Sequence, residues 1–482
     1  MSVIAEGALA RRGLLDAQQC AAAEDILARL ARDEIETVRV LFADQHGILR
    51  GKTLVAGALR SVFDKGLAIA STLLLKDSSH RTAFPVWSGQ EGPQAAPMQG
   101  ASDVLLVPDP ATFRRLPHVP HSAWILCDAV HRDASPIAFA PRHVLARAVD
   151  RLSGRGMAAT IGLEVEFHIF ERVAPALEHA QTTMPGQPPA TRALTQGYQF
   201  LTETRYAEAE PVLDDLRRAA QALGLAVRSV EVEMGPSQFE FTFEPGDPMA
   251  QADGLVMFRT LVKEICAARG LHASFMAKPR LPNIAANGWH IHQSLRDIDS
   301  GENLFAPDGP GELTPEASGW IAGLLTHARA ASLLCVPTVN GYKRYQPYQL
   351  APNRIQWGED NRGAMVRALT APGDAASRVE NRAPESAANP YFALAAQLIC
   401  GLDGITEGRT APPPTTSPYD GPAEALPGSL AEAIADFAAS ALMREALGAE
   451  FCDYLLRIKR FEWDRYIAAI SEWEQAEYFT LF

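Results

Sequence analysis

The sequence predicts an α+β protein in which a small β-rich unit precedes a larger domain of strands and helices. An alternating segment at 34–42 is followed by a turn and a second short strand. Four later segments have the alternation of strands and place charged residues two positions apart. From about 429 to 470, apolar residues recur every three or four positions, which indicates helices at the C-terminal end.

Composition narrows the classes of function. The chain has 482 residues, enough for two or three domains, and its 47% hydrophobic content excludes a disordered or collagen-like protein. With 44 Lys and Arg against 57 Asp and Glu, the formal charge of −13 repels phosphate backbones and anionic lipids. We therefore expect neither a nucleic-acid nor a membrane partner. The six cysteines form no Cys-x-x-Cys pair, and no apolar run reaches the roughly 18 residues that cross a bilayer, which favours a cytoplasmic protein.

The domain organisation follows from breaks in these patterns. Residues 1–34 combine apolar residues at helical spacing with acidic ones, which favours an amphipathic helical extension over a signal peptide. The β-rich unit is expected over 35–138. Pro141 suits the first position of a helix, so a second domain is expected over 139–482. Segments rich in Pro, Gly or Thr predict surface loops within it: 180–198, 301–315 and 408–428.

The four charged strand segments carry the chemistry. Side chains two apart on a strand share a face, so Glu164 and Glu166 lie on one face while Val165 and Phe167 lie on the other. A single segment of this kind is more often a solvated strand face. Four in one chain, each backed by large apolar residues, favour a common site. The other aligned sets are Glu231 with Glu233, Glu240 with Thr242, His290 with His292 and Ser294, and Arg378 with Glu380 and Arg382.

A metal site explains these acidic faces best. Several carboxylates that meet in one cavity raise one another's pKa values unless cations neutralise them. Glutamates with one histidine and no thiolate suit Mg²⁺ or Mn²⁺ better than Zn²⁺. Arginines also recur along the second half of the chain, and although any one could equally form a surface salt bridge, together they suit phosphate and carboxylate oxygens. The pattern therefore predicts phosphoryl transfer on a metal-bound phosphate.

The chain resembles glutamine synthetases and the related γ-glutamyl–amine ligases. The resemblance extends from the segment Phe42–Lys52 to the segment Asn389–Gly404 and so spans most of the chain. It implies an N-terminal β-grasp domain and a larger catalytic domain with an antiparallel sheet and flanking helices. It also implies a homo-oligomeric ring with active sites between neighbouring subunits, often a dodecamer of two hexamers.

The resemblance implies a role for each matching residue, with ATP and two or three Mg²⁺ or Mn²⁺ ions per site. One metal, which holds the acceptor carboxylate and the phosphoryl group, would be bound by Glu166, Glu233 and Glu240. The metal on the ATP phosphates would be bound by Glu164, His290 and Glu380. The ATP contacts would be His292, Ser294, Arg367 and Arg378. Arg344 and Arg382 would clamp the amino-acid carboxylates, Arg362 with Arg367 would steady phosphates, and the catalytic residues would be Arg362 and Arg344.

Departures from the family pattern concern the second substrate. Glutamine synthetases carry an Asp that draws in ammonium where this chain has Ala70, and a Glu that closes over ammonium where it has Leu350. A desolvated ammonium ion would lose partners worth roughly several kcal/mol, whereas an amine with a carbon body gains about 0.8 kcal/mol per buried methylene. The implied activity is an ATP-dependent ligase that forms a γ-glutamyl amide from glutamate and an alkyl, aromatic or polyamine.

Alternative functions compatible with the sequence are a glutamine synthetase that uses ammonia and a non-catalytic structural or regulatory relative. A ligase for another carboxylic acid is a further alternative, because Ala285 and Ala286 replace the Asn-Gly expected to contact glutamate. Asp77, His80 and Gln349 are alternatives for the group that deprotonates the amine.

Overall fold

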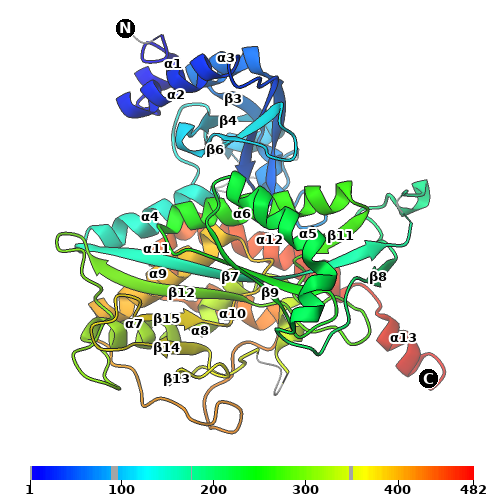
Figure 1. Ribbon diagram of the computed structural model, residues 1–482, viewed down its shortest axis with the longest axis vertical. Coiled ribbons are helices and arrows are strands. Elements are labelled where there is room, and N and C mark those ends of the chain that lie inside the picture. Colours follow the sequence, from blue (N-terminus) through cyan, green and yellow to red (C-terminus); the bar gives the residue numbers. More distant parts are fainter. Residues whose placement is uncertain (1–2, 88–95, 175, 347–350) are drawn as a thin grey trace.

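The computed structural model describes residues 3–87, 96–174, 176–346 and 351–482. A smaller N-terminal unit lies on one side of a larger unit whose long strands cross the molecule (Figure 1). Two positions singled out from the sequence, Gln349 and Leu350, lie outside the described residues. Within the described part of the chain, no helix is both long and apolar enough to span a membrane.

Two helices precede the first sheet, α1 (Ala8–Arg11) and α2 (Ala17–Arg29). The expected helical extension is therefore present but divided in two, because the chain turns at Gly13 with a left-handed φ of 70°. Helix α2 begins with a capping box in which the Asp16 side chain accepts from the Gln19 backbone N–H at 2.7 Å.

The N-terminal unit contains a six-stranded sheet. The predicted strand, turn and second strand are confirmed as an antiparallel hairpin, and the hairpin's first strand also pairs in parallel with β6. In spatial order the main path is β2 (Leu49–Val55), β1 (Thr37–Ala43), β6 (Ser122–Val130), β4 (Asp103–Pro108) and β3 (Leu67–Ala70). The short strand β5 (Arg114–Arg115) pairs with β6, and helix α3 (Leu59–Lys65) precedes β3.

A nine-stranded sheet forms the centre of the larger unit. Its pairs are antiparallel except for β13 with β14 at one end, so the expected antiparallel sheet is confirmed apart from that pair. The main path is β13 (Trp357–Glu359), β14 (Val366–Leu369), β15 (Arg378–Asn381), β12 (Trp289–Asp297), β7 (Met157–Arg172), β10 (Gln238–Phe243) and β9 (Val227–Val232). Strands β8 (Thr191–Ala193) and β11 (Leu271–Ser274) also pair with β7.

Helices cover this sheet (Figure 1). The predicted helix at Pro141 is confirmed as α4 (Pro141–Ser153), and the C-terminal periodicity as α10 (Leu430–Ala439), α11 (Ala441–Leu447) and α12 (Ala449–Ile467). The remaining helices are α5 (Glu203–Ala222), α6 (Pro248–Ala268), α7 (Pro315–Thr326), α8 (Ala328–Cys335), α9 (Pro390–Thr406) and α13 (Glu472–Tyr478). Helix α13 extends away from the body (Figure 1). The side chain of its Trp473 is exposed.

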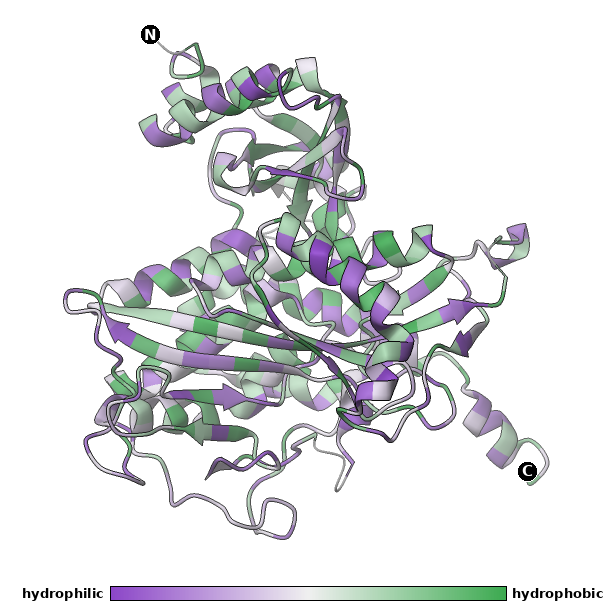
Figure 2. Ribbon diagram, viewed as in Figure 1, coloured by the Kyte–Doolittle hydropathy of each residue, from purple (hydrophilic) through white to green (hydrophobic). Residues whose placement is uncertain are grey.

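Alternate side chains of the central strand β7 point to an apolar face and a polar face of the sheet. Figure 2 shows this alternation of hydropathy along the long strands. Val165 and Phe167 are completely buried, and the Phe167 ring packs edge-on against Phe258 of α6 at 5.8 Å. Glu164 and Glu166 point to the opposite face, as the alternation predicts. The core of the larger unit therefore leaves one sheet face free for polar side chains.

Candidate active site

Strand register brings the predicted polar residues together. Adjacent antiparallel strands place directly opposed residues within contact of each other. Strand β7 lies between β10 and β12, and β12 lies next to β15, so four segments distant in the sequence share one surface. The opposed pairs are Glu166 with Glu240, Glu164 with His290, and His292 with Glu380.

Glu166, Glu233 and Glu240 form an acidic group, with one oxygen from each lying within 4.8 Å of the others. Burial, followed by the charge of Glu233, raises the pKa of Glu166 to about 8. Burial also raises the pKa of Glu233 to about 7, and burial with four neighbouring glutamates raises the pKa of Glu240 well above its ordinary value. The nearby arginines do not offset burial and mutual repulsion, so the protonated forms of these carboxylates are favoured more than in free glutamate.

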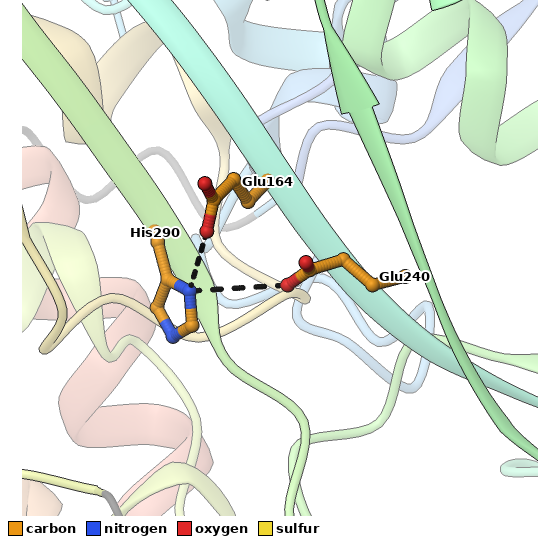
Figure 3. Close-up of side chains that lie close together, drawn as sticks. All are labelled: Glu164, Glu240 and His290. Atoms are coloured by element: carbon orange, nitrogen blue, oxygen red, sulfur yellow. Dashed lines mark hydrogen bonds and ion pairs between the residues drawn. The ribbon is translucent and has the colours of Figure 1, made fainter. Parts of the chain in front are cut away.

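A second group surrounds the His290 imidazole (Figure 3). Its Nδ1 lies 3.1 Å from Glu164, 3.9 Å from Glu240 and 3.7 Å from Glu380. Glu164 also lies 2.8 Å from Nε2 of His292. Burial disfavours the charged form of Glu164, but hydrogen bonds with both imidazoles outweigh burial and lower its pKa. Both histidines therefore converge on Glu164, although the sequence pattern placed only His290 among the metal ligands.

A buried scaffold holds Glu166 in place. Its Oε2 accepts the Gly288 backbone N–H at 2.8 Å and the Gln238 side-chain amide at 3.1 Å. That amide also donates to Asn287 at 3.0 Å, and Asn287 lies 2.9 Å from Nδ1 of the buried His168. Sequence reasoning did not assign these supporting roles. Only the position of Gln238, two before Glu240 on the same strand, gave a signal.

A side chain at Gly288 would crowd two residues of the site. A Cβ there would lie 2.9 Å from Nε2 of His290 and 3.1 Å from an Nη of Arg344. The backbone can therefore approach the acidic group closely enough to donate its N–H to Glu166.

Arg344 and Arg382 are buried beside the acidic groups, with 2% and 5% of their surface exposed. Arg344 donates to the carbonyl oxygens of Ala383 at 2.9 Å and Pro384 at 3.0 Å, and Arg382 pairs with Glu380. In each, the buried Nε has no hydrogen-bond partner among the described residues. Buried guanidinium groups with an unused donor suit a substrate carboxylate or phosphate.

The other predicted arginines take different positions. Arg367 lies 3.2 Å from the second oxygen of Glu380 and also pairs with Asp360. Arg378 donates from Nε to Nδ1 of His292 at 3.1 Å, which turns the Nε2 of that histidine toward Glu164. Arg362 is exposed in the turn before β14.

A cavity of about 330 Å³ adjoins the acidic groups beside β7 and β12. Three of the residues expected to contact ATP, His292, Ser294 and Arg378, line it together with Glu164. The fourth, Arg367, contacts Glu380 instead. A cavity with an arginine and the metal-binding candidates at one end is a suitable place for a nucleotide.

Three of the residues predicted for amine handling lie in the N-terminal unit, and the other two lie outside the described residues. Ala70 is exposed at the end of β3 in the N-terminal unit. Asp77 is buried, accepts backbone N–H groups of Ser79 and Arg81 at 2.9 and 2.8 Å, and pairs with Arg465 of α12. His80 is exposed. Asp77 therefore serves the packing of the N-terminal unit on α12.

The donor set fits hard divalent cations. Five carboxylates and two imidazoles, with no thiolate among the described residues at these groups, match the preferences of Mg²⁺ or Mn²⁺. Without a metal ion, protons neutralise clustered carboxylates, which raises their pKa values. The raised pKa values of Glu166 and Glu233 therefore fit a site that binds a cation.

Comparison with known proteins agrees with this geometry. A family model described as "Glutamine synthetase, catalytic domain" matches residues 138–478. The chain is 35% identical to the gamma-glutamylanilide synthase of an Acinetobacter species, over 98% of each chain. It is 34% identical to the gamma-glutamylethanolamide synthetase of Streptomyces coelicolor, over 94% of each.

Solved structures give the same result. The structure described as "Apo GmaS without ligand" superposes with a TM-score of 0.79 at 29% identity, covering 94% of this chain and 99% of that one. The predicted resemblance to amine ligases is thus confirmed. These matches show that the chain belongs to the glutamine synthetase family of ATP-dependent carbon–nitrogen ligases.

Proposed function

We propose that this protein uses ATP to join the side-chain carboxylate of glutamate to an amine other than ammonia. Two groups of acidic side chains with two buried arginines beside them support phosphoryl transfer to a carboxylate. Ala70 and Leu350, which stand where ammonium-using enzymes carry acidic residues, support an amine other than ammonia. The names of related proteins agree, since they include a gamma-glutamylanilide synthase, a gamma-glutamylethanolamide synthetase and a glutamate–isopropylamine ligase.

The reaction has two steps. The ATP γ-phosphoryl group is first transferred to the glutamate carboxylate, because a free carboxylate resists attack by an amine. The amine then attacks the resulting γ-glutamyl phosphate, the C–O bond to phosphate breaks, and the nitrogen loses a proton to leave an amide and inorganic phosphate.

Each group of residues has a task in this scheme. Glu166, Glu233 and Glu240 would hold one divalent cation, and Glu164, His290 and Glu380 the other. Such cations supply positive charge to the phosphoryl oxygens. Arg344 and Arg382 bind and orient the glutamate carboxylates, and His292, Ser294 and Arg378 bind ATP. Arg367, and Arg362 if its turn folds inward, steady the phosphates.

We also propose a cytoplasmic homo-oligomeric ring in which Ala70 of one subunit faces the site of its neighbour. Support comes from the exposure of Ala70 and from the place of its strand β3 in the N-terminal unit, apart from β7 and β12 (Figure 1). In this proposal the N-terminal sheet is a β-grasp domain. The parallel pairing of β1 with β6 beside an antiparallel hairpin supports that assignment.

An amine panel tests the activity. Phosphate release from ATP, with Mg²⁺ and glutamate present, should stay near baseline with ammonium and rise with at least one of an alkylamine, an aromatic amine, ethanolamine and a polyamine. The product mass should equal glutamate plus that amine less water. Strong dependence on ammonium would instead support a glutamine synthetase, and failure with every amine together with absent metal-dependent ATP binding would support a non-catalytic relative.

A specificity switch tests the explanation for the amine. The double substitution Ala70→Asp with Leu350→Glu restores both acids expected around ammonium, so it should raise ammonium use relative to the native amine by about tenfold or more. Unchanged preference would contradict the role given to these two positions while leaving the ligase activity itself untouched.

A further inference from the structure

A large cavity lies on the side of β7 opposite the acidic groups. It has a volume of about 760 Å³ and lies between the β1–β2 turn and helices α6, α8 and α12. Phe275 lines it, and the Phe275 ring stacks at 4.8 Å on Phe167 of β7. Because Phe167 and Glu166 are adjacent on β7, their side chains point to opposite faces. The sheet therefore separates this cavity from the active site.

The charged side chains that line this cavity are mainly cations. The cations are Arg81, Arg259, Lys263, Lys459 and Arg465. Glu462 is the one carboxylate among the described lining residues. That carboxylate is already used, since it accepts from Lys459 at 2.8 Å and from the Ser78 backbone N–H at 2.9 Å. Arg465 pairs with Asp77 at 3.1 Å. This local charge is opposite in sign to that of the whole chain, −13.

Arg259 and Lys459 are the buried members of the set, with 8% and 4% of their surface exposed, and of these two only Lys459 forms an ion pair among the described residues. One Nη of Arg259 donates to the Ala388 carbonyl at 2.7 Å, while the buried Nε has no hydrogen-bond partner within the described parts of the chain. Glu385 offsets part of its charge, but that carboxylate is held by Thr338 through contacts of 3.0 and 2.8 Å. A buried guanidinium with an unused donor is costly unless an anion joins it.

Lys263 stands one helical turn beyond Arg259 on α6, so the two side chains share a face. The residue is exposed, yet burial by surrounding atoms and the charge of Arg259 lower the pKa of its ammonium group. No acidic side chain of the described residues pairs with it in an ion pair. Two adjacent cations, neither in an ion pair with a described carboxylate, form the core of an anion site.

The remainder of the wall is largely apolar, with Phe275, Leu334, Val339, Phe392 and Leu455. Ligand cavities of drug-sized molecules measure about 300–1,000 Å³ and combine apolar walls with a few polar groups. We propose that this cavity binds an organic anion, with a carboxylate or phosphate group on Arg259 and Lys263 and an apolar body against these side chains. This proposal does not depend on the proposed ligase activity.

Such a ligand would contact both units of the chain. The β1–β2 turn reaches the cavity at Gly47, which has a left-handed φ of 69°. A Cβ at Gly47 would lie 3.2 Å from Cα of Asn389 and 3.5 Å from an Nη of Arg259. The turn therefore packs directly onto the proposed anion site, and an occupied site should stabilise the contact between the two units.

Thermal unfolding of the full chain with small anions tests this proposal. The probes are phenylacetate, phenyl phosphate and inorganic phosphate, with phenylacetamide as the uncharged match of phenylacetate. Saturating ADP, Mg²⁺ and glutamate are present throughout. They occupy the active site, so that a rise in Tm does not come from anions that bind there. We expect a saturable rise in Tm with phenylacetate or phenyl phosphate at millimolar concentration, and none with phenylacetamide. The organic anion that raises Tm at the lower concentration shows whether the site prefers a carboxylate or a phosphate group.

Variants of Lys263 locate the binding. Lys263→Met should weaken the effect at least tenfold, whereas Lys263→Arg should keep most of it because the charge remains. Lys65→Met, which removes an exposed lysine of α3, is the matched control and should respond like the wild type. The proposal is overturned if neither organic anion gives a saturable shift, or if Lys263→Met responds as the wild type does. A failed amine panel would leave these expectations unchanged.

Discussion

The side chains on the two sides of the sheet at β7 carry net charges of opposite sign. On one face, Glu164 and Glu166 join three further glutamates around two histidines. On the other, Phe167 packs beneath a cavity lined by Arg259 and Lys263, neither of which forms an ion pair with a described side chain. A third charged region, around Arg142, shows the ordinary alternative, because that arginine bonds with Asp109, Asp128 and Asp253 at 2.7 to 3.1 Å. Charge that a fold pairs internally supports structure, whereas charge left unpaired in a cavity indicates a ligand.

The largest expected effect comes from removing one acid of the metal-binding face. Glu240→Gln keeps the size of the side chain but removes its charge, so turnover should fall by about 10³-fold or more, roughly 4 kcal/mol. Phosphate release from ATP with glutamate and the native amine measures it. Glu244→Gln is the matched control, because Glu244 is exposed just beyond the same strand. Equal turnover of both variants would contradict the metal assignment.

The second effect concerns the scaffold behind that face. Gln238→Leu removes the amide that donates to Glu166 at 3.1 Å while keeping similar volume. Partners that orient metal ligands typically contribute 10–100-fold, so we expect Mg²⁺ affinity to fall by about that factor. Activity should recover at high Mg²⁺ if Gln238 only positions Glu166. A loss that Mg²⁺ cannot restore would instead indicate a direct role.

The third effect is a pH dependence without metal. The folded-state pKa values of Glu166 and Glu233, about 8 and about 7, exceed the unfolded value of roughly 4.3. Between these limits the folded chain binds more protons than the unfolded one, so stability falls as pH rises, by up to about 1.4 kcal/mol per pH unit for each carboxylate. Denaturant unfolding at pH 6 and pH 8 measures it. Mg²⁺ should stabilise more at pH 8, and an equal gain at both would argue against proton displacement.

The smallest effect belongs to the cationic face. Lys263→Met relieves repulsion with Arg259, so the unliganded chain should gain a few tenths to about 1 kcal/mol in free energy of unfolding. Chemical denaturation without added anions is the measurement. A clear loss of stability would mean that Lys263 has a structural partner, and the contrast between the two faces would then weaken.

The sequence predicted the acidic face well because strand alternation is regular. Once β7, β10, β12 and β15 are recognised, residues two apart must share a face, and Glu164, Glu166, Glu240 and His290 follow. Pairing order was not available from the residues themselves, and so the convergence of both His290 and His292 on Glu164 came only with the fold.

The cationic cavity could not be predicted in this way. Arg259 and Lys263 lie on a helix, where charged residues at this spacing usually face solvent. The cavity that they line depends on the β1–β2 turn, more than two hundred residues earlier in the sequence, and on α12 near the C-terminal end. Similarly, Arg362 matched the family pattern, yet its turn leaves it exposed in the single chain.

Calorimetric titration of Mg²⁺ into the metal-free protein at pH 7.5, repeated in two buffers with different ionisation enthalpies, tests the central claim most directly. The raised pKa values of Glu166 and Glu240 mean that binding must displace protons, so the apparent enthalpy should change with the buffer. Glu240→Gln should lose this proton release together with most of the affinity. Mg²⁺ binding that releases no protons, or that is unchanged in Glu240→Gln, would contradict a metal site at these glutamates.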